Sequence, residues 1–148
     1  MQEKKILIAS DHGGFILKED LKIYLQKKGY EVLDCGTHST DSVNYPDYAK
    51  CLVKGIQEHS ADKGILICTS GIGMSIAANR YSFIRAALVH EPEEAHLSRA
   101  HNNANVLVFG AKFVKPEVAE KCIDEFLATD FEGGRHCVRV EALERMGK

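Results

Sequence analysis

The 148-residue sequence has no hydrophobic run long enough to span a membrane. The segment MQEKKILIAS pairs lysines with a short apolar run, but Asp11 follows at once without a small-residue cleavage pattern, so we expect no signal peptide. The formal net charge of -2 lacks the basic excess that nucleic-acid-binding domains carry. The sequence therefore predicts a cytoplasmic protein that engages neither a membrane nor a nucleic acid.

The cysteine pattern argues against a disulfide framework and against a structural zinc site. The cysteines are odd in number, widely spaced and without a CxxC pair. They are Cys35, Cys51, Cys68, Cys122 and Cys137. We expect most of them to be buried, because a free cysteine behaves as a small hydrophobic residue.

Nucleotide-binding fingerprints are missing from the glycine-rich stretch GILICTSGIGMSIAANR. It lacks GxxxxGK[ST], which argues against ATP or GTP hydrolysis, and Ile76 stands where GxGxxG requires its third glycine. The sequence also has no HExxH zinc motif, internal repeat or low-complexity segment. The glycine residues of this turn therefore serve a purpose other than binding a nucleotide.

What the sequence does contain is an alternation of apolar runs and helix-period segments, which predicts a single α/β domain over residues 1–148. Strands are expected at residues 5–10, 31–34, 64–68, 85–90 and 105–109. Helices are expected at residues 15–28, 47–59, 72–79, 92–99, 116–128 and 135–146. Continuous apolar strands favour a parallel sheet with helices on both faces, here a Rossmann-like three-layer α/β/α sandwich with five strands and a C-terminal helix.

Ligands of such sheets bind at the carboxyl ends of the strands. Cys68 ends the third expected strand, and the amides exposed by Gly71 and Gly73 at the next helix start can hold an anion and favour a thiolate. Such a thiol could serve as a nucleophile or as a proton-transfer base. The structural alternative is a buried thiol beside a tight turn.

Two further groups carry candidate chemistry. Asp11 and His12 follow the first strand, where they could form an acid–base pair, meet an anion, or be a helix cap with a surface histidine. Arg135 and Arg139 are four residues apart on one helix face, and with His136 they could clamp a phosphate or simply be solvated.

The segment HEPEEAHLSRAHNNAN is rich in metal-ligand residue types, but its spacing argues against a metal site. His96 and His101 would be about 140° apart around a helix that turns about 100° per residue. We expect Glu93, Glu94 and His96 to form a solvated face, and His101 to lie in the loop before the last strand.

Four stretches, SDHGGF, CTSGIGMSIAANR, LSRAHNNANVLVFG and EGGRHCVRV, follow in this order on what we expect to be one edge of the sheet. Together they resemble the type B ribose-5-phosphate isomerase and galactose-6-phosphate isomerase family over residues 5–140. The resemblance implies an aldose–ketose isomerase of sugar phosphates that uses neither a metal nor another cofactor. It also implies a homo-oligomer, a dimer or a dimer of dimers, whose subunits share active sites.

The resemblance further implies roles for single residues. Cys68 would move the proton between C1 and C2 through a cis-enediolate, with His101, Ser70 and Asp11 serving ring opening. The implied binding residues are Thr69, Gly71, Ile72 and Gly73 for the enediolate, Tyr45 and Asn102 for the sugar, and His12, Arg135, Arg139 and Lys112 for the phosphate. Thr69 replaces a glycine that is common in relatives, so the loop must have a geometry that a β-branched residue can adopt. Lys112 stands where many relatives have arginine.

Ribose 5-phosphate and ribulose 5-phosphate are the expected substrates. A hexose 6-phosphate of the galactose or allose type is the alternative, and residues 37–45 together with the residues around His101 would decide between them. A non-catalytic phosphosugar-binding subunit is a further alternative, against which the joint presence of Cys68, Ser70, His101 and Asp11 argues.

Overall fold

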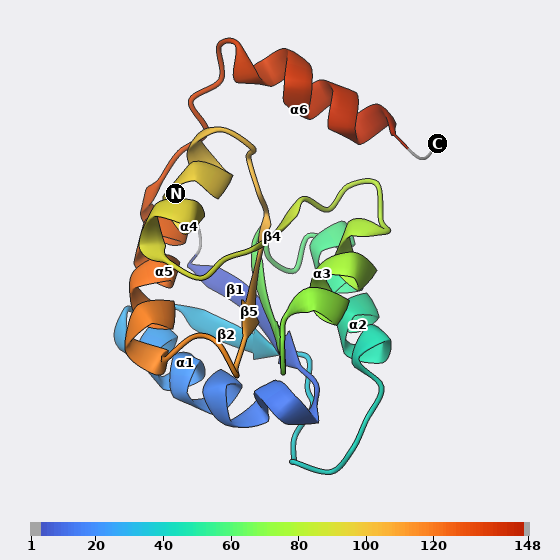
Figure 1. The fold of residues 1–148 in the computed structure, drawn as a ribbon, viewed down its shortest axis with the longest axis vertical. Coiled ribbons are helices and arrows are strands. Elements are labelled where there is room, and N and C mark those ends of the chain that lie inside the picture. Colours follow the sequence, from blue (N-terminus) through green and yellow to red (C-terminus); the bar gives the residue numbers. More distant parts are fainter. Residues whose placement is uncertain (1–3, 147–148) are drawn as a thin grey trace.

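Five parallel strands form a central sheet in the order β2-β1-β3-β5-β4 (Figure 1) in the computed structural model, which describes residues 4–146. The strands are β1 (Lys5–Ser10), β2 (Glu31–Asp34), β3 (Gly64–Cys68), β4 (Ala86–Leu88) and β5 (Val106–Gly110). Helices cover both faces of the sheet, which confirms the predicted three-layer α/β/α sandwich.

The helices begin close to the predicted positions. They are η1 (His12–Gly14), a short 3-10 turn, followed by α1 (Phe15–Lys27), α2 (Tyr45–Gln57), α3 (Ile72–Asn79), α4 (Pro92–Ala100), α5 (Pro116–Ala128) and α6 (His136–Arg145). A proline occupies the first turn of α2, α4 and α5, where its fixed φ suits the helix and its missing N–H costs nothing. No helix within residues 4–146 has both the length and the apolar character needed to cross a bilayer.

Side chains alternate between the two helical layers along each inner strand. On β3, Ile65 and Ile67 pack with α1, α4 and α5, whereas Leu66 and Cys68 pack with α2 and α3. The whole of β3 is buried, because neither face of the sheet meets solvent there. This two-sided burial explains why the inner strands read as continuous apolar runs.

The fourth strand is shorter than predicted, with residues 86–88 in place of 85–90. It lies at the edge of the sheet and pairs only with β5. The N–H of His90 donates to Glu94 Oε1 of the following helix at 2.6 Å, so it pairs with that helix and not with the sheet. The extra residues of the predicted strand therefore belong to its connections.

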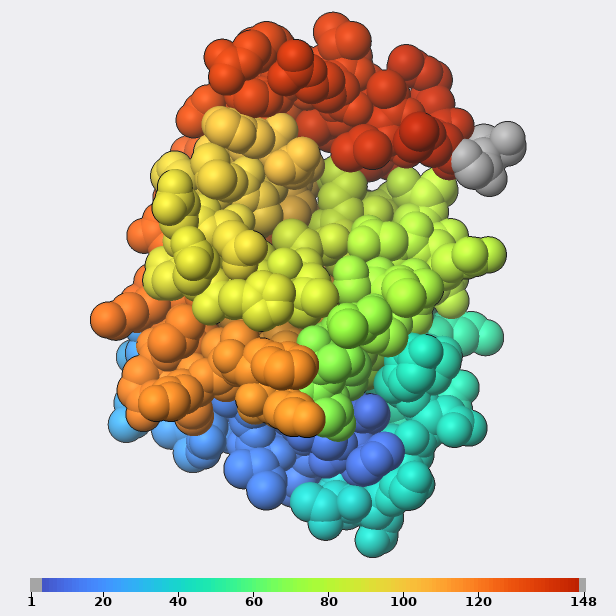
Figure 2. All heavy atoms as spheres, in the orientation of Figure 1, coloured from blue at the N-terminus to red at the C-terminus, as the bar shows by residue number. Residues whose placement is uncertain are grey.

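Helix α6 confirms the predicted C-terminal helix and lies across the end of the molecule where the strands begin (Figure 1). Arg85 and Glu144 form an ion pair that ties α6 to the start of β4. A groove of about 700 Å³ separates α6 from the body, and Arg80, Asn102 and Leu143 help to line it. Figure 2 shows α6 as a separate layer over the segments coloured yellow and green.

Candidate active site

The Cys68 thiol lies at the carboxyl end of β3, where it is 5% exposed. The backbone N–H of Gly71 donates to Cys68 Sγ over 3.2 Å. Gly71 has a φ of 79°, in the left-handed region that favours glycine, and α3 begins at the next residue, Ile72. The turn therefore directs the backbone N–H of Gly71, just before the helix start, toward the sulfur.

The same turn accommodates the two residues that follow the thiol. Thr69 does not belong to the residues with positive φ, which confirms that the loop has a geometry open to a β-branched side chain. Ser70 Oγ accepts a hydrogen bond from the N–H of Ile72 at 3.2 Å, so its own proton remains available to a ligand. The N–H of Lys112 donates to Thr69 O at 3.0 Å and brings the loop after β5 against this turn.

Asp11 and His12 lie beside the turn. Asp11 is buried, and its Oδ1 accepts from the N–H groups of Gly13 at 3.0 Å and Gly14 at 3.2 Å, so the predicted cap is confirmed for Asp11, whereas His12 is only half-buried and is not a free surface histidine. His12 Nδ1 accepts from the N–H of Val43 at 3.1 Å, which leaves the ring proton on Nε2 as a donor for an anion. A Cβ added to Gly13 would fall 2.0 Å from Thr69 Oγ1, so the two loops touch.

Tyr45 completes this group from the start of α2. A Cβ added to Gly73 would lie 2.6 Å from Cζ of Tyr45, so the ring packs on the first turn of α3 only because residue 73 is glycine. The ring is 38% exposed and thus faces solvent on its other side. We call this collection the thiol half-site: Asp11, His12, Tyr45, Cys68, Thr69, Ser70, Gly71, Ile72, Gly73 and Lys112.

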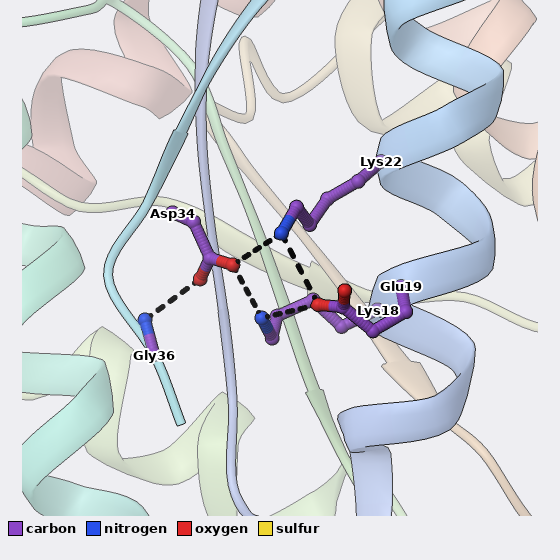
Figure 3. A network of polar contacts seen from close by, with 5 residues as sticks. All are labelled: Lys18, Glu19, Lys22, Asp34 and Gly36. Carbon is purple, nitrogen blue, oxygen red and sulfur yellow. Dashed lines mark hydrogen bonds and ion pairs between the residues drawn. The ribbon is translucent and has the colours of Figure 1, made fainter. Parts of the chain in front are cut away.

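A partly buried ion-pair network joins α1 to the end of β2 and the loop that follows it (Figure 3). Lys18 is fully buried, and its Nζ lies 2.6 Å from Asp34 Oδ2, which Lys22 Nζ also contacts at 2.8 Å. Asp34 Oδ1 accepts from the N–H of Gly36 at 2.8 Å, and Gly36 O accepts from the N–H of Ser10 at 2.7 Å. The network therefore holds the loop after β2 against the residue that precedes Asp11.

The same contacts set the charge of Asp34. Burial acts to raise the pKa of its carboxyl group, but the hydrogen bonds from Lys18, Lys22 and the Gly36 amide outweigh burial and lower the pKa. Asp34 is therefore an anion throughout the neutral range, which the charge of the buried Lys18 ammonium requires.

The other cysteines differ from Cys68 in setting. All five are free, as predicted, but only Cys68 and Cys122 are buried, so the expectation that most would be interior is wrong. Burial, with Cys51 alongside, raises the pKa of Cys35 to about 12, and burial raises the pKa of Cys122 to about 11. Those two thiols stay protonated at neutral pH and are unsuited to proton transfer.

A second group of predicted site residues lies at the other end of the strands, where the strands of the sheet begin. His101 caps the end of α4, five residues before Val106, which pairs with Gly64 at the start of β3. Cys68 pairs with Gly110 at the other end of these strands, about 13 Å away at about 3.3 Å per residue. We call the second group the histidine half-site: His101, Asn102, Arg135 and Arg139.

The expectation that all four recognised stretches share one edge is therefore wrong. SDHGGF and CTSGIGMSIAANR follow strands, but HNN and EGGRH follow α4 and α5, which run back toward the edge where strands begin. In a parallel sheet, helix ends and strand ends lie at opposite edges, because each helix returns the chain to the start of the next strand. Arg135 and Arg139 are exposed there, on α6 and the residue that precedes it.

Two more residues adjoin the histidine half-site: Glu132, which the sequence did not single out, and His136, which it placed only beside the two arginines. The rings of His101 and His136 are stacked with centroids 4.2 Å apart. Glu132 Oε1 lies 3.9 Å from His101 Nε2 and 3.7 Å from His136 Nε2. Burial, then the neighbouring His101 and Arg135, lower the pKa of His136. Glu132 and His136 follow His101 by 31 and 35 residues in the sequence, so no local motif could predict this cluster.

The predicted solvated face of α4 is confirmed. Glu93, Glu94 and His96 are exposed. His96 Nδ1 lies 3.1 Å from Glu125 Oε1 on α5. His96 therefore contacts α5 and does not belong to the group around His101.

The fold and its polar strand ends define a parallel α/β protein with a candidate ligand site at the carboxyl ends of β1, β3 and β5. More particularly, residues 6–143 match the Ribose/Galactose Isomerase family, and the chain belongs to that family. It is 46% identical to ribose-5-phosphate isomerase B of Escherichia coli over 95% of this chain and 94% of that protein. The family resemblance drawn from the sequence is thereby confirmed.

Solved structures agree with this assignment. The ribose 5-phosphate isomerase of Thermotoga maritima superposes with a TM-score of 0.95 at 52% identity, covering 98% of this chain and 100% of that chain. Ribose-5-phosphate isomerase B of Mycoplasma genitalium, solved with bound ribulose-5-phosphate, gives a TM-score of 0.90 at 39% identity, covering 95% and 94% of the two chains.

Proposed function

We propose that the protein interconverts ribose 5-phosphate and ribulose 5-phosphate. The observation that carries the proposal is the buried Cys68 thiol, hydrogen-bonded by the Gly71 amide at the start of α3, in a chain of the Ribose/Galactose Isomerase family. The relative from Mycoplasma genitalium binds ribulose-5-phosphate, which favours a pentose over the hexose alternative.

The proton transfer follows from this geometry. The Cys68 thiolate takes the proton from C2 of the open-chain aldose, and negative charge develops on the C1 oxygen. Backbone amides of residues 69–73 stabilise this oxyanion, because fixed donors need no reorganisation as the charge forms. The same thiol then returns the proton to C1 while a proton moves from O2 to O1, which leaves the ketone at C2.

Ring opening precedes proton transfer and needs both half-sites. The Ser70 hydroxyl, with its oxygen already engaged by the Ile72 amide, can donate to the substrate, and Asp11 would assist from the residue that follows β1. His101 would exchange a proton between the anomeric hydroxyl and the ring oxygen. Tyr45 and Asn102 would hold the sugar from opposite sides.

The phosphate lies at the far end of the substrate in this proposal. Arg135 and Arg139 bind it as charge-assisted donors, with His12 Nε2 and Lys112 from the thiol half-site. Binding energy gained at the phosphate then fixes the carbon chain against Cys68. A glycine turn without lysine is sufficient at the reacting carbons, because the phosphate is bound elsewhere.

A homodimer would unite the half-sites. In a two-fold symmetric pair, the thiol half-site of one subunit can meet the histidine half-site of the other, which generates two identical sites. Apolar side chains beside both half-sites are exposed and could form that interface: Ile72, Ile76 and Phe113 at one edge, and Val138 and Met146 at the other. Binding of the substrate would then require that the dimer has formed.

The proposal is tested by isomerisation assays with purified protein on ribose 5-phosphate and on allose, galactose and glucose 6-phosphates, with and without chelator. We expect strong turnover of ribose 5-phosphate that the chelator leaves unchanged. Preference for a hexose phosphate would replace the pentose substrate, and loss of activity that a divalent ion restores would contradict metal-free chemistry.

A further inference from the structure

We infer that His101, Glu132 and His136 form a binding site for a divalent transition ion such as Zn²⁺, and that occupation of this site inhibits the enzyme. The inhibitory effect rests on the proposed function, whereas the binding does not. The three residues come from the end of α4, the loop after α5 and the first residue of α6. One ligand atom from each lies within 4.8 Å of the other two.

The Glu132 distances suit a metal with small adjustment, whereas one imidazole must turn. The stacked rings of His101 and His136 are only 15° from parallel, and an imidazole nitrogen binds a metal in the plane of its ring, so His101, whose side chain is 37% exposed, has to rotate out of the stack to share an ion with His136. A tetrahedral zinc ion with bonds of about 2.0–2.1 Å places its ligand atoms about 3.3 Å apart. Glu132 Oε1 is 3.9 Å from His101 Nε2 and 3.7 Å from His136 Nε2, so each contact needs to close by about half an ångström around the ion. The Glu132 side chain is 56% exposed and has room to make this movement.

A buried, unpaired nitrogen gives independent support for a ligand. His136 is 6% exposed, and within residues 4–146 its Nε2 has no hydrogen-bond partner. Buried polar atoms are nearly always paired, so an orphan acceptor or donor facing a carboxylate at 3.7 Å points to a missing atom between them. A metal ion would satisfy His136 Nε2 and Glu132 at once.

The ligand set selects the type of ion. Two imidazoles and one carboxylate suit zinc and its neighbours in the transition series, and they leave a fourth position open. Magnesium and calcium prefer sites made of oxygen atoms and should not compete. Arg135 and Arg139 add positive charge nearby, which weakens binding of a cation, so we expect occupation at micromolar metal.

The consequence for activity follows from His101. An ion bound to its Nε2 removes the lone pair that ring opening requires, and it competes with the sugar for the same space. Inhibition should therefore be reversible by chelator. This is an inhibitory site and assigns no role to a metal in the reaction.

The test is a titration of metal-free protein with Co²⁺, followed by its visible d–d bands, alongside Zn²⁺ inhibition of ribose 5-phosphate turnover. Glu132→Gln and His136→Gln should each weaken Co²⁺ binding about tenfold or more and raise the inhibitory Zn²⁺ concentration equally, relative to each variant's own uninhibited rate. His96→Gln, which removes another histidine beside a glutamate, should change neither value.

Unchanged Co²⁺ affinity in both variants, with their folds intact by circular dichroism, would overturn the site. A strong near-ultraviolet sulfur-to-cobalt band would also overturn it, because the ion would then be bound by a cysteine. If the protein failed to isomerise any sugar phosphate, the proposed function would fall, while the cobalt spectra of the three variants would still decide the metal site.

Discussion

Cys68 and His101 lie at opposite edges of one sheet, separated by the full length of β3 and β5. The family-based roles assign both residues to the same substrate molecule. A single chain cannot satisfy that assignment without large rearrangement of its core, because the strands between them are completely buried. A second copy of the chain is the simplest source of the missing half.

This arrangement predicts complementation between inactive variants. Cys68→Ala and His101→Asn should each be nearly inactive alone, but a mixed dimer contains one site with both native residues. After random mixing of equal amounts, half of the dimers contain one chain of each variant, and one of the two sites in each such dimer is intact. About a quarter of wild-type activity should therefore return. The measurement is turnover after co-refolding the two variants.

Mixing Cys68→Ala with Cys68→Ser is the matched control, since no combination of those chains has an intact thiol. Absence of any recovery in the Cys68→Ala and His101→Asn mixture, despite mixed dimers seen by native mass spectrometry, would show that each site is built within one chain.

Replacing the thiol itself should separate chemistry from binding. Cys68→Ala removes the proton-transfer base, so kcat should fall by about 10²–10⁴-fold, while the dissociation constant for ribose 5-phosphate changes little. The loss of one buried sulfur should leave the fold intact. Rapid proton exchange at C2 of the substrate in this variant, measured by NMR in heavy water, would assign the base to another group.

The arginines of α6 should act on substrate binding. Arg139→Ala removes a charge-assisted phosphate contact of about 1.5–3 kcal/mol, which corresponds to an increase in KM of about 10- to 150-fold. Arg145→Ala, on the same exposed helix but not placed at the phosphate, is the control. Equal KM values for the two variants would remove Arg139 from the phosphate site.

The buried network at Asp34 should be required for stability. Asp34→Asn leaves the Lys18 ammonium buried without its closest carboxylate, and we expect a loss of about 3 kcal/mol in the free energy of unfolding at pH 7. Asp20→Asn, on the exposed side of α1, should change it by less than about 0.5 kcal/mol. Urea unfolding of both variants measures the difference.

The same network predicts a dependence on acid. The folded-state pKa of Asp34 is lowered from the ordinary value of 3.8, so its contribution is complete above about pH 4 and is lost as pH falls through the lowered value. Wild-type protein should therefore lose more stability between pH 4 and about pH 2 than Asp34→Asn does. Parallel pH profiles for the two proteins would contradict the assigned charge pairing.

The sequence by itself determined the elements of the fold and the chemistry of each candidate residue. Continuous apolar runs predict buried parallel strands, since a strand covered on both faces has no polar side, and prolines and glycines indicate where helices begin and turns reverse. Among the strands only β4 was misjudged in length, because an edge strand with one partner ends where its connections turn away.

The tertiary structure alone decided which residues come together. Local spacing cannot report that α4 and α5 return the chain to the other edge of the sheet, so His101 and Arg139 separate from Cys68 within one chain. Nor can it report that Glu132 and His136 fold back onto His101, or that Lys18 reaches Asp34 across 16 residues of sequence. Such contacts depend on how helices pack on the sheet, which is set by the burial of the whole core and by no single segment.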